Sequence, residues 1–173
     1  MQHNNPKSKP IPGQESKTAE TVMIIDDDEN NLLILETYLH DAGYEIITAT
    51  NGSEAWDFIK LFGDDISLIL LDRMMPIMNG MEFLKLLKGH PKHSDIPVIM
   101  QTAAAMKHQV VEGISSGVYY YLRKPFDETK VIELIKSALS GERNMRKKRT
   151  QNVMIDEGKK NSIIVDPDLY KNL

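Results

Sequence analysis

The amino-acid sequence predicts an α/β fold in which a doubly wound, five-stranded parallel sheet carries helices on both faces. Between residues 21 and 141, short apolar runs alternate five times with segments of helical periodicity. The first, third and fourth runs are apolar throughout, as is typical of strands covered on both faces of a parallel sheet. Right-handed crossovers between successive strands would then place helices on both faces.

The first two strand–helix units follow from local signals. A buried strand is expected at 21–26, and a helix at 29–42, because leucines recur there at helical spacing. Gly43 stands where the residue after a helix C-cap is commonly glycine. The second strand is expected at 44–50, where β-branched residues are frequent, and the second helix at 53–62, where apolar residues recur at helical spacing.

The other three units repeat the pattern. The third strand, ISLILLD, is an apolar run that ends on an aspartate, and the fifth contains three consecutive tyrosines. The last helix has apolar residues along one face. These units are expected as strands at 66–72, 96–103 and 118–124, with helices at 80–88, 107–116 and 127–140.

Composition divides the chain into a polar tail at 1–20, one domain at 21–141 and a basic extension at 142–173. The tail is rich in Pro, Lys, Ser and Asn and is expected to be flexible, because it cannot bury enough apolar surface to offset the entropy of ordering. The domain carries 18 Asp and Glu against 10 Lys and Arg, whereas the extension carries 8 basic against 5 acidic residues. Its run RNMRKKR, at 143–149, is interpreted as a solvated basic linker.

The extension is expected to be too short and too polar for a separate output domain. Apolar segments at 152–155 and 162–165 indicate a small hairpin rather than the helical bundle of a helix-turn-helix protein, so no direct DNA binding is expected. No apolar run approaches the ~18 residues that cross a bilayer. The chain contains no cysteine and starts without an apolar signal segment, so a cytoplasmic location is expected.

Polar residues follow the strands at one edge of the predicted sheet. Asp26 and Asp27 close the first strand, Asp72 the third, Thr102 the fourth and Lys124 the fifth. In such sheets, ligands bind beyond the carboxyl ends of the strands. Clustered carboxylates repel one another unless a cation neutralises them, and hard oxygen ligands suit Mg²⁺. A carboxylate beside such a cation can attack phosphorus, which predicts phosphoryl transfer onto an aspartate.

Four segments resemble a known family. IIDDDEN, LLDRMMPIMNG, QTA and KPF, in this order, are similar to the receiver domain of bacterial two-component response regulators (CheY-like) over about residues 21–141. The resemblance implies a flavodoxin-like sheet with strand order 2-1-3-4-5. It further implies that Asp72 is phosphorylated and that Asp26, Asp27, Asp72 and the backbone carbonyl of Met74 bind Mg²⁺. Thr102 would be the switch hydroxyl, Lys124 would contact the phosphoryl group and Tyr121 would be the aromatic switch residue. The peptide bond before Pro125 would be cis.

The function implied by the resemblance is that of a phosphoacceptor signalling protein, not of an enzyme with a separate substrate. A histidine kinase or histidine phosphotransfer protein would supply the phosphoryl group. The face formed by 107–116, 118–124 and 127–140 would then change and control a protein partner or dimerisation. Met74 and Ala104 stand at positions that tune hydrolysis in this family, and neither side chain can orient a water molecule, so a long-lived aspartyl phosphate is expected.

Two alternatives remain open at this stage. The chain could be the receiver part of a larger regulator whose output domain follows it. It could also be a phosphatase of the haloacid dehalogenase type, because Asp26 and Asp28 form a D-x-D after the first strand. That reading leaves Asp72 and the KPF segment without a role, and Asp28 is better interpreted as the N-cap of the first helix.

Overall fold

Five parallel strands form one sheet in the computed structural model, which describes residues 19–103 and 117–151. The spatial order of the strands is β2-β1-β3-β4-β5, with every neighbouring pair parallel. This confirms the doubly wound sheet and its strand order. The strands are β1 (Thr21–Ile25), β2 (Glu45–Ala49), β3 (Ile66–Asp72), β4 (Val98–Thr102) and β5 (Tyr120–Arg123).

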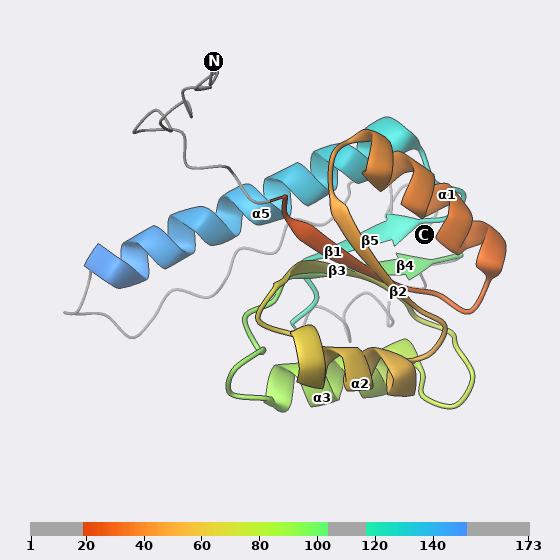
Figure 1. Cartoon of the computed structure of the whole chain (residues 1–173), viewed down its shortest axis with the longest axis horizontal. Helices are drawn as coiled ribbons and strands as arrows, with labels where there is room; N and C mark the ends of the chain where they lie inside the picture. The colour runs from red at the N-terminus through yellow and green to blue at the C-terminus, as the bar shows by residue number, and fades with distance from the viewer. Residues whose placement is uncertain (1–18, 104–116, 152–173) are drawn as a thin grey trace, which may run out of the picture.

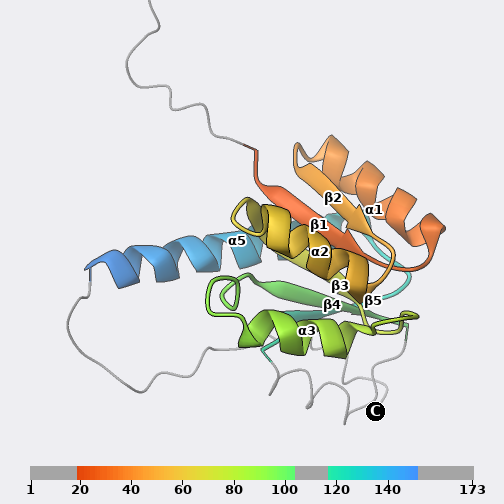
Figure 2. The same ribbon diagram turned by 60° about the horizontal axis from the view of Figure 1, so that its bottom comes forward.

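Helices cover the sheet on both faces (Figures 1 and 2). One face packs against α1 (Glu29–Asp41) and α5 (Glu128–Gln151), and the other against α2 (Gly52–Phe62) and α3 (Gly80–Gly89). Successive strand residues alternate between the two cores because side chains of a strand point to opposite faces in turn. The helix expected at 107–116 lies outside the described residues.

The last helix is longer than the sequence pattern indicates. A helix ending at Ser140 and a basic linker at 143–149 were the expectation, whereas α5 runs on to Gln151. A single glycine, Gly141, costs a helix only about 1 kcal/mol, and Arg, Lys and Met are good helix formers. The helix therefore passes through the domain boundary predicted at Gly141. No helix in the described part of the chain is both long and apolar enough to span a bilayer.

Three helices begin at the edge of the sheet where the strands end. The side chains of Asp28, Asn51 and Asn79 cap α1, α2 and α3 by accepting hydrogen bonds from backbone N–H groups of the first turns. At α3 the Glu82 carboxylate accepts a hydrogen bond from the Asn79 N–H, which completes a capping box. Gly43 follows α1 with φ +82°, as its position predicted. These caps order the chain around the carboxyl ends of β1 and β3.

The expected hairpin at 152–155 and 162–165 and most of the expected tail at 1–20 lie outside the described residues.

Candidate functional site

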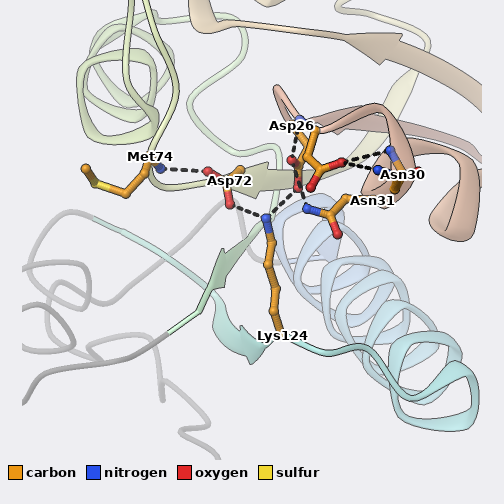
Figure 3. Close-up of polar contacts among 7 residues, drawn as sticks. Asp26, Asn30, Asn31, Asp72, Met74 and Lys124 are labelled. Atoms are coloured by element: carbon orange, nitrogen blue, oxygen red, sulfur yellow. Dashed lines mark hydrogen bonds and ion pairs between the residues drawn. The ribbon is translucent and has the colours of Figure 1, made fainter.

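Lys124 joins two buried aspartates at the carboxyl edge of the sheet (Figure 3). Its Nζ donates to Oδ1 of Asp72 at 2.6 Å and to Oδ2 of Asp26 at 2.8 Å. Asp26 follows β1, Asp72 ends β3 and Lys124 follows β5, so three strands meet in this contact. Asp26 is fully buried and Asp72 is 5% exposed. The single ammonium offsets one of the two negative charges on these carboxylates, which have little access to water.

The second oxygen of Asp26 is held from the start of α1. Oδ1 accepts the backbone N–H of Asp28 at 3.0 Å and the side-chain amide of Asn31 at 3.2 Å. With Lys124, the Asp26 carboxylate therefore accepts three hydrogen bonds. Asn31 was not among the predicted site residues, although its place in the first turn after β1 is the signal that could have identified it.

The two oxygens of Asp72 have different partners. Oδ2 accepts the backbone N–H of Met74 at 2.7 Å, while Oδ1 faces Lys124. Burial raises the pKa of the Asp72 carboxyl and the charge of Asp26 adds to this, against the opposing effects of Lys124 and the Met74 N–H. Burial alone would lower the pKa of Lys124, but its hydrogen bonds with Asp26 and Asp72 outweigh burial and raise it. The site thus holds a poorly solvated carboxylate against a firmly protonated ammonium.

Lys124 lies between the end of β5 and a cis peptide bond. The Lys124–Pro125 peptide bond is cis, as predicted. The Lys124 N–H donates to the Thr102 carbonyl at 2.9 Å, which extends the pairing of β4 with β5 by one residue. The Lys124 ammonium lies 5.9 Å from the ring centroid of Phe126.

Thr102 and Tyr121 lie on the face of the sheet that packs against α2 and α3. The Tyr121 ring belongs to the apolar core on that face and is 2% exposed. Tyr121 pairs with Met100 in the sheet, and Thr102 follows Met100 by two residues, so strand alternation puts the Thr102 side chain on the same face. The aromatic ring is thus already in a buried position in this structure.

The third predicted carboxylate is placed differently from the other two. Asp27 is exposed, and Asp28 caps α1, where the Asn30 N–H lowers the pKa of Asp28. Within residues 19–103 and 117–151, no three Asp, Glu or His side chains converge as a set that could hold a metal ion. The structure therefore brings Asp26 and Asp72 together around Lys124 and leaves Asp27 toward solvent.

The loop from β3 to α3 holds the Asp72 backbone in place. A Cβ at Gly80 would collide with the Asp72 carbonyl oxygen, so this close approach requires glycine. Ile77 has φ +68°, an uncommon conformation for a β-branched residue, and is 84% exposed. The Met74 side chain is also exposed, at 74%. The loop is thus anchored at Gly80 and presents apolar side chains to solvent beside the site.

Comparisons with known proteins support one family. The family model described as a response regulator receiver domain matches residues 22–136. Response regulator SaeR of Staphylococcus aureus (strain USA300) is 31% identical over 136 residues, which are 79% of this chain and 58% of SaeR. The chain thus spans less than two thirds of the length of that relative.

Solved structures agree with the family model. Chemotaxis protein CheY4 of Vibrio cholerae is 27% identical, with a TM-score of 0.66 over 70% of this chain and 99% of its own. A CheY-like receiver domain protein of Methanospirillum hungatei JF-1 is 27% identical, with a TM-score of 0.67 over 74% and 99%. A chain of the CheX–CheY–BeF3–Mg²⁺ complex from Borrelia burgdorferi is 30% identical, with a TM-score of 0.64 over 68% and 87%. With its sheet order, its paired strand-end aspartates and this agreement, the chain belongs to the response regulator receiver domain family.

Proposed function

We propose that this protein is the phosphoacceptor of a two-component or phosphorelay system and that Asp72 takes the phosphoryl group. The donor would be a phosphohistidine of a histidine kinase or histidine phosphotransfer protein. The observation that carries the proposal is the 2.6 Å contact between the Lys124 ammonium and Oδ1 of Asp72. That contact puts a fixed positive charge where the negative charge of an incoming phosphoryl group would lie.

The transfer itself exchanges one bond to phosphorus for another. A carboxylate oxygen of Asp72 forms the new P–O bond, the P–N bond of the donor breaks, and its electron pair stays on the imidazole nitrogen, which then takes up a proton. The burial of Asp72 supports this role, because a carboxylate with few water contacts has less solvation to lose on attack. The Met74 N–H, bound to Oδ2, fixes the orientation of the carboxylate.

The donor set at the site fits a magnesium ion in its chemistry. A carboxylate has about four lone-pair sites, and the hydrogen bonds described above use three on Asp26 and two on Asp72. Both therefore retain acceptor capacity, and the exposed Asp27 and the backbone carbonyl of Met74 would complete the protein ligands. When bound, Mg²⁺ would neutralise charge on the phosphoryl oxygens.

The signal would pass from the phosphoryl group to the output surface through Thr102 and Tyr121. Thr102 and Tyr121 share one face of the sheet, and Tyr121 is already buried there. Phosphorylation would stabilise one arrangement of these two residues and shift a pre-existing equilibrium of the surface that includes β5 and α5. A protein partner or a second copy of the chain would read that surface in the cytoplasm, without direct contact to DNA.

Intact-mass analysis after incubation with acetyl phosphate and Mg²⁺ tests the proposal. The native protein is expected to gain one phosphoryl group and the Asp72→Asn variant none. The matched control is Asp64→Asn, because Asp64 is an exposed carboxylate that also pairs with a lysine, Lys92. This control should be phosphorylated as the native protein is. An equal adduct on Asp72→Asn would contradict the proposal.

A further inference from the structure

Gln101 on β4 has a buried side chain whose hydrogen-bonding groups find no partner among the described residues. The residue is fully buried. Within the part of the chain that the structure describes, neither Oε1 nor Nε2 of its amide has a hydrogen-bond partner. Glutamine is rarely buried completely, and buried polar side chains are nearly always hydrogen-bonded. Gln101 has no role in the phosphoryl transfer proposed above.

Strand alternation places this amide in the same row as the phosphoacceptor. Ile99 packs in the core against α1 and α5, as does Leu70 of β3, with which it is paired. Two residues further on, Asp72 is paired with Gln101, so the two side chains leave the same face of adjacent strands. Gln101 is paired in turn with Leu122 of β5.

The lysine has to pass this row to reach the aspartates. In the strand order, β4 lies between β3 and β5, so the Lys124 side chain crosses the end of β4 on its way to Asp72 and Asp26. Gln101 therefore lies in the β4 layer under that crossing. Lys124 has three N–H donors, of which the contacts with Asp26 and Asp72 use two.

Resting on the proposed function, we propose that Gln101 is a positioning residue whose amide gains its hydrogen bonds only when Asp72 is phosphorylated. In the free site, the Asp72 carboxylate binds Lys124 with its full charge. Once an Asp72 oxygen carries the phosphoryl group, that carboxylate charge is lost and the ammonium turns to the phosphoryl oxygens. Oε1 of Gln101 then accepts an N–H of Lys124, and Nε2 donates to an oxygen of the modified Asp72. The amide thereby holds Lys124 over the phosphoryl group.

The consequence is a bias toward the phosphorylated arrangement. An unpaired buried amide destabilises the resting protein, and the same amide, once paired, does not destabilise the phosphorylated one. The free-energy difference between the unpaired and the paired amide changes the equilibrium constant between the resting and the phosphorylated arrangement by about tenfold. A ligand that mimics the phosphoryl group should therefore bind about tenfold less tightly when the amide is replaced by an apolar side chain of similar size.

The test compares Gln101→Met and Gln101→Leu with the control Ile99→Leu, a volume-conserving change two residues earlier on the same face. The probe is beryllofluoride with Mg²⁺, measured by calorimetric titration and by thermal unfolding with and without the probe. Both Gln101 variants should unfold without the probe at the native temperature or above it, bind beryllofluoride about tenfold more weakly than the native protein, and gain less stability from it. Ile99→Leu should bind as the native protein does.

Two results would overturn the assignment. If folded Gln101 variants bind beryllofluoride within a factor of ~2 of the native affinity, the amide does not act on the phosphorylated state. If they lose as much stability without the probe as with it, the amide is already satisfied at rest, for example by a buried water molecule. Failure of the native protein itself to bind the probe would instead contradict the proposed function, so the two failures are distinguishable.

Discussion

The ammonium of Lys124 lies 2.6 Å from Oδ1 of Asp72, although 52 positions separate the two residues in the sequence. The strand order brings them together, because the ends of β3 and β5 lie on either side of β4 at one edge of the sheet. The same ammonium also contacts Asp26, so a single cation separates two buried carboxylates. The stability of the domain and the phosphoryl transfer that we propose for Asp72 would therefore depend on the same side chain.

Replacing Lys124 by methionine should destabilise the domain at pH 7. The change leaves the Asp26 and Asp72 carboxylates close together without their cation. Breaking a buried ion pair from one side costs about 3–5 kcal/mol, and partial exposure of the Lys124 side chain, 19%, reduces the expected loss to about 2–3 kcal/mol. Urea unfolding measures this loss.

The control for that change is Lys92→Met, which breaks an exposed ion pair with Asp64 and should cost far less, because water and salt screen exposed pairs. Equal losses in the two variants would show that Lys124 does not stabilise the buried carboxylates.

Asp72→Asn should be more stable than the native protein at pH 7. Burial raises the pKa of Asp72, so the folded state binds a proton there more tightly than the unfolded state does. The folded protein therefore loses stability as the pH rises from the ordinary value of 3.8 through the raised pKa, and the full loss is present above it. The gain in Asp72→Asn should shrink as the pH falls through the raised pKa toward 3.8, and it should be absent below 3.8. Unfolding free energies measured across this range test the sign, and a variant that is less stable at pH 7 would contradict it.

His93 should make the domain sensitive to mild acid. Its ring is buried and stacks on His90 with centroids 4.7 Å apart. Burial lowers the pKa of His93 and the charges of His90 and Lys92 add to this, against Asp64. Stability from the neutral ring is therefore complete above pH 6.5 and falls as the pH drops through 6.5 toward the lowered pKa.

The His93→Phe variant keeps a ring in the stack. Its melting temperature should fall less between about pH 7.5 and pH 5.5 than that of the native protein. His40→Gln is the matched control, because it removes a histidine at an exposed position. An acid response that is unchanged in His93→Phe would assign it to other groups.

Met74→Asn should shorten the lifetime of the aspartyl phosphate severalfold. Met74 follows Asp72 by two residues, and its exposed side chain cannot hold a water molecule by hydrogen bonds. An amide at this position can orient a water toward phosphorus. Because the site is on the surface, the variant should unfold at the native temperature. Loss of the phosphorylated mass with time, after the donor is removed, gives the rate, and equal rates would show that position 74 does not limit hydrolysis.

The sequence was most informative where buried strands end on charged residues. The run at 66–72 ends on Asp72, as β3 does, because an apolar strand followed by an acidic residue has few alternative registers. Alternation also separates Asp26, two residues after the inward Ile24, from the exposed Asp27. That the charged residues at the strand ends lie at one edge of the sheet followed from the parallel arrangement of the strands alone.

Other features depend on distances that a sequence does not contain. The place of Asn31 in the first turn after β1 marks it as a candidate, but the sequence does not show that its amide donates to Asp26 while that of Asn30 donates to Asp28. The end of α5 was misplaced because a glycine followed by basic residues resembles a helix stop, while the cost of one glycine is small beside the helix propensity of the residues after it. That the Gln101 amide has no hydrogen-bond partner within residues 19–103 and 117–151 likewise emerges only from packing.

The central claim is that Asp72 is the residue that carries the phosphoryl group. Borohydride reduction of the protein phosphorylated by acetyl phosphate converts an aspartyl phosphate to homoserine, which peptide mass spectrometry locates. Homoserine is expected at position 72, and unmodified aspartate at Asp26, Asp27 and Asp28. Homoserine at position 26 with Asp72 unmodified would contradict the account and favour the phosphatase alternative.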